Sequence, residues 1–298
     1  MRRILVISYY FPPNNSSGMH RPWALARHLP EMGYEPVFLT SGPVWNSMEP
    51  QCPQLSEEVD SRKIGVIAKQ ARRRYTLFSK IGLGSLYAVA RIFDPKGIWA
   101  WGILRKARKV CRQKNIDCVL TTSPPYALSL LGTDLKKSTG LPWLADFRDP
   151  WSFSISESWL GGVGYVLDRM CQSWAFRLAD AVIVNTPACY DRWERVSPCA
   201  ARVKGRVITN GYQVDRSPAP GEDRGRDFVI AHTGVFYYNE AFDRLPHRVR
   251  RFFTQLISYS PANVDRSRAS AGFLLRSVMK AISNHPELGA RFGIDMIS

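Results

Sequence analysis

The chain has 298 residues, of which 45% are hydrophobic and 22% are charged. These ordinary values exclude a disordered, collagen-like or coiled-coil protein, and the length predicts two domains. The six cysteines are scattered without a CxxC pair, which excludes a disulfide scaffold and argues against a structural zinc site. The apolar run at the N-terminus is too short for the core of a signal peptide, which predicts a cytoplasmic protein.

The formal net charge of +16 is concentrated in one segment. Fifteen lysines and arginines and a single acid lie between Arg62 and Lys114. Such a block predicts an anionic partner: nucleic acid, acidic lipid or a phosphorylated substrate. No motif typical of nucleic-acid binding accompanies the block, so a nucleic-acid-binding protein is the weaker alternative. The longest apolar run, at residues 81–93, is too short to span a bilayer but long enough to lie on one.

Strands and helices alternate along the first two thirds of the chain. A continuous apolar run at residues 3–9 predicts a strand that is buried on both faces of a parallel sheet. A loop follows at residues 11–18, then a helix with Pro22 in its first turn and Gly33 at its end. The same pattern predicts further strands at residues 35–40, 117–122, 141–147, 181–185 and 206–209, and helices at residues 98–114, 126–139, 163–178 and 187–196. This order is typical of a Rossmann-like, doubly wound α/β domain.

A change of composition marks a second domain. Residues 216–226 are rich in proline, glycine and charge, which predicts a linker after a first domain at residues 1–215. Residues 227–298 open on a predicted strand at 227–232 and close on another at 292–297. Two strands are too few for an independent parallel sheet, so we expect this part to be an incomplete second α/β domain.

Four loops at the carboxyl ends of predicted strands carry unusual chemistry, and ligands bind at these ends in open α/β sheets. Residues 14–21 combine small residues with His20 and Arg21 at the start of a helix, which suits a phosphate; a turn that caps the helix is the alternative. This loop lacks the glycine spacing of a dinucleotide site, which argues against an NAD-dependent enzyme.

The other three loops differ in what they indicate. Residues 146–151 bring together two carboxylates, a guanidinium and an indole, groups that bind sugar hydroxyls and stack on a pyranose; a structural Arg–Asp pair with a core tryptophan is the alternative. The hydroxyls and prolines of residues 121–126 suit a pocket wall, although they can also cap the next helix. The Asn210-Gly211 pair is by itself an everyday turn.

Taken together, these segments resemble the family-4 glycosyltransferases, which have the two-domain GT-B fold. The likeness is carried by residues 4–40, 93–102, 117–132, 141–151, 179–186, 208–212 and 228–238. It implies transfer of a sugar from a UDP- or GDP-linked donor to an acceptor, with retention of anomeric configuration and with no metal or other cofactor. The family's paired-glutamate motif has no counterpart in residues 227–298.

The loops and the resemblance together predict the site residues. Arg148 stands where many relatives have a histidine, and we expect it to act in catalysis with Asp149. The predicted donor-binding residues are Ser17, Gly18, Asn210, Gly211, Thr233 and Gly234, and the predicted acceptor-binding residues are His20, Arg21, Ser123 and Trp151.

The resemblance also gives the basic segment a partner, because acceptors in this class are often polysaccharides or lipid-linked saccharides at the inner leaflet. We therefore expect a peripheral protein on the inner face of the membrane and no nucleic-acid partner. The predicted membrane-surface residues are Arg72, Arg73, Arg74, Trp99, Trp101, Arg105 and Lys106. A merely solvated basic face is one alternative, and a truncated, inactive transferase that persists as a membrane-bound partner is another.

Overall fold

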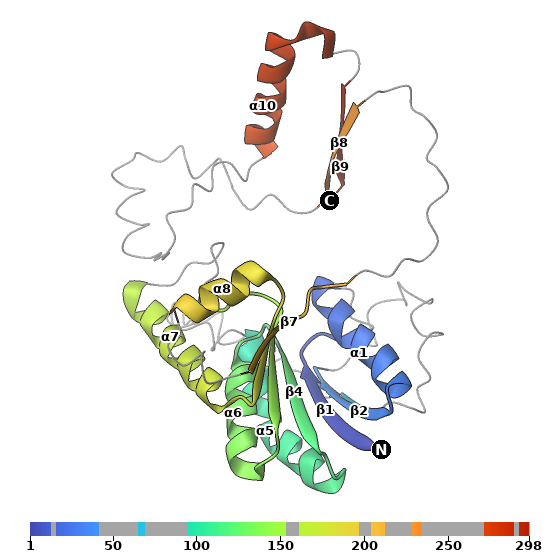
Figure 1. Ribbon diagram of the computed structural model, residues 1–298, viewed down its shortest axis with the longest axis vertical. Helices are drawn as coiled ribbons and strands as arrows, with labels where there is room; N and C mark the ends of the chain where they lie inside the picture. The colour runs from blue at the N-terminus through green and yellow to red at the C-terminus, as the bar shows by residue number, and fades with distance from the viewer. Residues whose placement is uncertain are drawn as a thin grey trace. The chain divides into compact units, whose positions relative to one another are not determined.

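The computed structural model describes residues 1–12, 16–41, 65–68, 95–152, 161–196, 204–211, 228–233, 271–288 and 292–297. The chain divides into two compact units, Met1–Gly211 and Tyr212–Ser298 (Figure 1). The predicted linker at residues 216–226 lies outside the described residues.

A seven-stranded parallel sheet forms the centre of the first unit, with the order β3-β2-β1-β4-β5-β6-β7. The order reverses between β1 and β4, where ligands bind in sheets of this kind. The predicted doubly wound α/β class is thus confirmed, and each predicted strand lies within two residues of its observed bounds. The strands are β1 (Arg2–Ser8), β2 (Tyr34–Thr40), β3 (Gly65–Ala68), β4 (Cys118–Ser123), β5 (Trp143–Phe147), β6 (Ala181–Val184) and β7 (Lys204–Val207).

Helices cover both faces of this sheet. On one face α6 contacts α5 on one side and α7 on the other, and α1 lies on the opposite face (Figure 1). A short 3-10 turn, η1 (Ser17–Met19), leads directly into α1. The helices are α1 (His20–Glu31), α5 (Pro95–Gln113), α6 (Ala127–Thr139), α7 (Gly161–Leu178) and α8 (Pro187–Val196).

The core lies in two layers because the strands alternate their side chains between the two faces. In β1, Leu5 and Ile7 join the cluster under α5, α6, α7 and α8, whereas Val6 joins the cluster under α1. All three side chains are completely buried, as expected for a strand covered on both faces. Burial on both sides fixes the register of the strands and so fixes which loops meet at their carboxyl ends.

The described part of the second unit holds two parallel strands, β8 (Phe228–Thr233) and β9 (Phe292–Ile297), with α10 (Ala271–Asn284) and a 3-10 turn, η6 (Pro286–Leu288). Both strands were predicted from the sequence.

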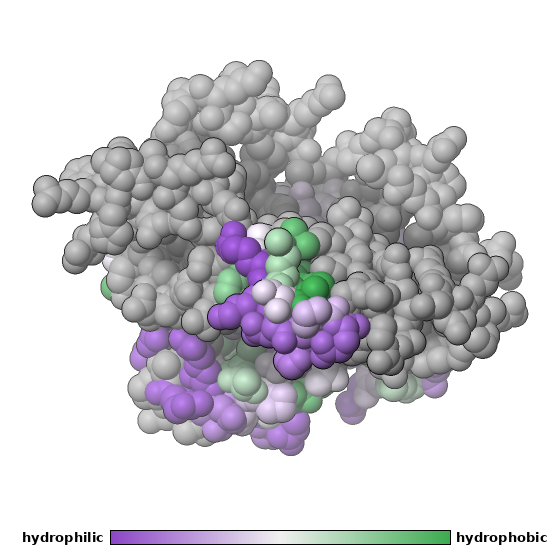
Figure 2. Space-filling view, turned by 90° about the horizontal axis from the view of Figure 1, so that it is seen from above, coloured by the Kyte–Doolittle hydropathy of each residue, from purple (hydrophilic) through white to green (hydrophobic). Residues whose placement is uncertain are grey.

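Hydrophilic and hydrophobic residues stand next to one another on the described surface seen in Figure 2.

Candidate functional site

Polar side chains line up across the carboxyl ends of three neighbouring strands. Ser8 of β1 pairs in register with Thr122 of β4, and Thr122 pairs with Asp146 of β5. All three are buried. The row lies at the reversal of the strand order, which is where a ligand is expected in this fold.

Arg148, just after β5, connects the loops that follow β1, β4 and β5. Its guanidinium donates to the carbonyl of Gly18, to the carbonyl of Ser123 at 3.3 Å from Nε and to the carbonyl of Pro124 at 2.9 Å from Nη2. Its backbone N–H also donates to the carbonyl of Ser123, at 3.1 Å. The side chain is 6% exposed, so these bonds to three carbonyl groups are shielded from water. Arg148 therefore acts as the common anchor of the three loops.

Gly18 lies where the first of these loops approaches the anchor. A Cβ atom added there would lie 2.6 Å from Cδ2 of Tyr10 and 2.7 Å from Nη1 of Arg148. Both distances are shorter than real Cβ contacts, so a side chain would displace the loop. Glycine is required here by the close packing of the loop against the guanidinium.

Arg21, in the first turn of α1, forms a second connection. Its Nη1 lies 3.3 Å from Oδ1 of Asp146, its Nη2 donates to the carbonyl of Ile208, and its Nε lies 3.4 Å from Oδ1 of Asn210. The loop after β7 is thereby attached to the carboxyl end of β5. Two residues predicted for different ligands, Arg21 and Asn210, are in contact.

The buried charges at this place shift each other's pKa. Burial raises the pKa of Asp146 from its ordinary value of 3.8, and the neighbouring Arg21, Thr122 and Arg148 act in the opposite direction. Burial lowers the pKa of Arg148, while Asp146 and Asp149 raise it. Each charge is thus held by its neighbours against the cost of leaving water. The sequence predicted a role for the 146–151 cluster but not this buried position of Asp146.

Several predicted site residues are accessible at this edge of the sheet. Ser17, His20 and Asp149 are exposed, as are Asn210 and Gly211. Ser17 and His20 flank Gly18 at the start of the α1 segment, and Asp149 follows the Arg148 anchor directly. Exposed polar groups therefore stand beside a buried, hydrogen-bonded framework.

Two predicted acceptor-binding residues lie in the interior instead. Trp151 is 1% exposed and stacks on Tyr126, with ring centroids 5.2 Å apart. Ser123 is completely buried, and its hydroxyl lies 3.2 Å from that of Ser129. The prediction that these two side chains contact an acceptor is wrong, because the sequence pattern does not show which side chains after a strand turn back into the core.

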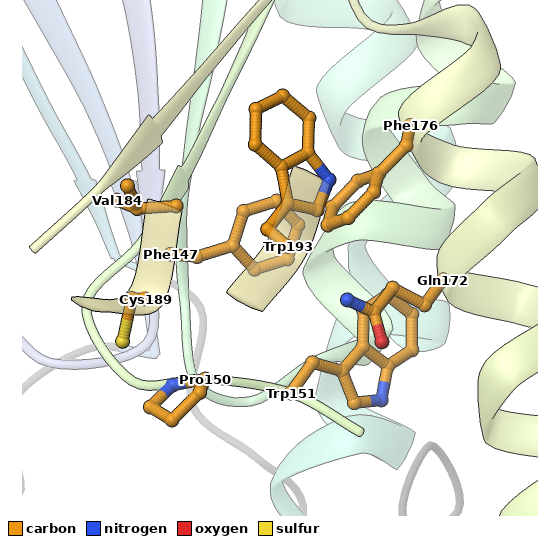
Figure 3. A pocket seen from close by; sticks show the side chains of 8 residues that line it. All are labelled: Phe147, Pro150, Trp151, Gln172, Phe176, Val184, Cys189 and Trp193. Atoms are coloured by element: carbon orange, nitrogen blue, oxygen red, sulfur yellow. The ribbon is translucent and has the colours of Figure 1, made fainter. Parts of the chain in front are cut away.

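Trp151 also lines a small interior cavity between β5, β6, α7 and α8 (Figure 3). The rings of Phe147, Phe176 and Trp193 gather on one side of it. The centroid of the Phe176 ring lies 5.0 Å from that of Phe147 and 5.4 Å from that of Trp193. Gln172 holds the chain after β5 by accepting hydrogen bonds from the backbone N–H and the hydroxyl of Ser152. The lining is mostly aromatic and aliphatic core, so we place the site at the strand ends and not in this cavity.

The predicted membrane-surface residues divide into three groups. Trp101, Arg105 and Lys106 are exposed on α5. Trp99 is 2% exposed and packs against Tyr9, so its prediction as a membrane anchor is wrong. The other three residues of this prediction, Arg72, Arg73 and Arg74, lie outside the described residues.

The predicted donor residues of the second unit are only partly described. Thr233 pairs with Ile297 in the β8–β9 ladder, and Gly234 lies outside the described residues. Among the side chains that the structure describes, no group of three or more histidines, cysteines or acids could hold a metal ion. Within the same described residues, none of the helices is both long and apolar enough to cross a membrane.

Comparison with known proteins gives the fold and the family. Residues 23–216 match the model of Glycosyltransferase Family 4. No protein with a curated description matches the sequence. The sucrose-phosphate synthase of Thermosynechococcus elongatus superposes with a TM-score of 0.55 at 15% identity, over 100% of this chain and 71% of that one. Arabidopsis thaliana UGT89C1, complexed with UDP-L-rhamnose, superposes with a TM-score of 0.52 at 10% identity, over 100% of this chain and 69% of that one.

The structural likenesses show the GT-B type of α/β fold, as expected from the sequence. The family model covers more than half of the chain, including the loops after β4, β5 and β7, whereas Gly18 and Arg21 precede the matched residues. The chain belongs to glycosyltransferase family 4.

Proposed function

We propose that the chain transfers a sugar from a UDP- or GDP-linked donor to a saccharide or lipid-linked acceptor, with retention of anomeric configuration, at the inner face of the membrane. The observation that carries the proposal is the Arg148 anchor, which joins the loops after β1, β4 and β5 at the reversal of the strand order. Membership of the family supports a sugar transfer at this place.

In this proposal Arg148 is a positioning residue. Its guanidinium already donates to three carbonyl oxygens and is almost completely buried. Three of its five N–H groups are engaged by these backbone carbonyls, and their loss would leave polar groups without partners in the interior, which is costly. Arg148 therefore holds Gly18 and Pro124 at fixed places around the substrates.

The donor phosphates would bind at the loop that leads into α1. The N-terminus of a helix carries a partial positive charge and directs backbone N–H groups at an anion. Because Gly18 has no side chain, the backbone can approach the diphosphate closely. Arg21 adds a cation whose side chain is 12% exposed. These groups would stabilise the leaving diphosphate as the bond to the sugar breaks.

Asp149 is the group that we assign to substrate contact. Its carboxylate is exposed directly after the anchor, where it can accept a hydrogen bond from an acceptor hydroxyl and orient that hydroxyl toward the sugar. In a retaining transfer the acceptor attacks from the face that the diphosphate leaves, so the acceptor must be held close to the departing phosphate.

A substitution that keeps the shape of Asp149 tests this assignment. Asp149→Asn removes the negative charge, and we expect kcat to fall by about 100-fold or more with an unchanged melting temperature. Asp191→Asn is the matched control, because Asp191 is exposed on α8 and has no role in the proposal. Wild-type turnover of the Asp149→Asn protein would contradict the assignment.

The donor and the stereochemistry are tested on the whole chain. Thermal unfolding with nucleoside diphosphates and nucleotide sugars should show stabilisation by one base and not by others, about 2.7 kcal/mol at a ligand concentration 100 times Kd. NMR of the product should show the anomeric configuration of the donor. An inverted product would overturn retention, and no stabilisation by any nucleotide would overturn donor binding.

A further inference from the structure

Helix α7 presents an apolar face to the solvent. Five hydrophobic side chains, spaced three or four residues apart or adjacent, share one face of the helix and remain exposed. We name them the α7 stripe: Val163 (70% exposed), Val166 (53%), Leu167 (39%), Met170 (63%) and Trp174 (44%). From Val163 to Trp174 the stripe extends over about 16 Å of helix.

The stripe is not explained by the core of the unit. The opposite side of α7 already supplies the core with Ala175 and Phe176, which are buried. Single exposed hydrophobic residues are normal on a protein surface, but a continuous row marks a surface that binds a partner. Because its inner side is fixed in the core, α7 can offer the stripe only as a helix lying flat along that partner.

Cations lie at the Trp174 end of the stripe and on the neighbouring helices. The Nζ atom of Lys137 on α6 lies 4.7 Å from the centre of the Trp174 ring, and Arg177 is exposed one turn after Trp174. On the other side of α6, the outer face of α5 exposes Trp101 together with Arg105, Lys106, Lys109 and Arg112.

The acids on these elements are partly neutralised by ion pairs within the unit. Asp134 on α6 is held by Arg108, at 2.6 Å from Nη2 to Oδ1. Asp180, just after α7, is held by Lys136, at 2.8 Å from Nζ to Oδ2. The described outer surface of α5, α6 and α7 is thus apolar and cationic at the same time.

The apolar and cationic composition of this surface distinguishes between two candidate partners of the α7 stripe. A second copy of the chain on a two-fold axis would place the same patch against itself, so that cations would face cations. A bilayer with anionic headgroups accepts both features: apolar side chains enter the boundary of the acyl chains, and lysines and arginines stay with the phosphates. We infer that the α7 stripe lies on the surface of an anionic lipid bilayer, an inference that rests on the proposed action at the membrane. The inference places the apolar membrane contact on α7, a helix that the predicted membrane-surface residues did not include.

Vesicle co-sedimentation of the full chain tests the inference, with phosphatidylcholine vesicles that contain or lack phosphatidylglycerol. Met170→Asp puts a charge into the stripe and should weaken binding to the anionic vesicles about tenfold or more. Met32→Asp is the matched control, because Met32 is an exposed methionine at the end of α1, on the opposite face of the sheet; this variant should bind like the wild type. Met170→Leu keeps an apolar side chain at this position and should bind the anionic vesicles like the wild type.

Other results would overturn the inference. Equal binding of Met170→Asp and wild type would exclude the stripe, and failure of the wild type to bind anionic vesicles would exclude the lipid partner. A wild-type dimer in size-exclusion chromatography that Met170→Asp converts to a monomer would assign the stripe to a second copy. Nucleotide stabilisation is measured on the same samples. A wild type that is stabilised by a nucleotide but does not bind anionic vesicles contradicts this inference and leaves the proposed sugar transfer standing.

Discussion

Gly18 and Gly162 have opposite surroundings, which makes them a matched pair. Gly18→Ala would force a methyl group against Tyr10 and Arg148, so we expect a loss of about 1–3 kcal/mol in the free energy of unfolding and weaker nucleotide binding. Gly162, near the start of α7, has nothing within 4 Å of an added Cβ; Gly162→Ala should stabilise by about 0.5–1 kcal/mol. Urea unfolding measures both, and equal effects would contradict the packing described around Gly18.

Asp146 gives the stability a defined pH dependence. Because its pKa is raised in the folded state, the native protein binds a proton more tightly than the unfolded chain does. The stability of the wild type relative to Asp146→Asn is therefore greatest below the ordinary value of 3.8 and falls as pH rises through the raised pKa. Urea titrations from pH 4 to pH 8 measure the difference.

The Arg21→Gln substitution tests the same pH dependence of stability. It removes the main cation that opposes the rise in the pKa of Asp146, so the loss of stability should extend to higher pH than in the wild type. A wild-type stability that increases with pH relative to Asp146→Asn would show a lowered pKa and contradict the burial argument.

The sequence indicated which loops form the site but not how their side chains divide between core and surface. Gly18 and Arg21 of the first predicted loop contact Arg148 and Asp146 of the third, because parallel strands bring their carboxyl ends to one edge of the sheet. The burial of Trp151 depends on Tyr126, a contact between distant loops that no local pattern contains. Trp99 is different: with Ile103 and Ala107 it follows the buried face of α5 at helical spacing, a signal that was present in the sequence.

Among the elements, β5 and α6 depend on one tryptophan. The indole of Trp143 lies against Gly132 of α6, and its Nε1 donates to the hydroxyl of Thr121 on β4 at 3.0 Å, with both side chains completely buried. Trp143→Phe should destabilise the protein by about 3 kcal/mol, since it opens a cavity and leaves a buried hydroxyl without its donor.

A double-mutant cycle separates the two contributions. Adding Thr121→Val to Trp143→Phe removes the unsatisfied hydroxyl, so the double variant should lose less stability than the sum of the single variants. Strict additivity in chemical denaturation would show that the hydrogen bond contributes nothing.

Helix ends were predictable where glycine stops the helix. Gly33 and Gly140 have φ of 82° and 71°, a region that glycine enters without strain. Strand β3 was not predicted. It has only four residues, Gly65–Ala68, and it pairs with β2 at the edge of the sheet. A run of four residues gives little sequence pattern, and the strand forms here because it pairs with β2.

At the scale of the whole molecule, the described residues of the two units differ in the size of the sheet that they form. The first unit, Met1–Gly211, holds the seven-stranded sheet and both described core clusters, so residues 1–211 expressed alone should unfold in a single cooperative transition by circular dichroism. The described sheet of the second unit has two strands, fewer than the three that independent stability usually needs. A non-cooperative melt of residues 1–211 would show that the first unit requires the rest of the chain.

The Arg148 anchor has a consequence for any attempt to change what the protein recognises. The loop after β5 carries the guanidinium of Arg148, and the loops after β1 and β4 supply its carbonyl partners, which are those of Gly18, Ser123 and Pro124. Exchanging one loop for that of a relative would leave a buried cation without part of its shell. A change of specificity by loop exchange should therefore succeed only when the loops after β1, β4 and β5 are exchanged together, as one unit.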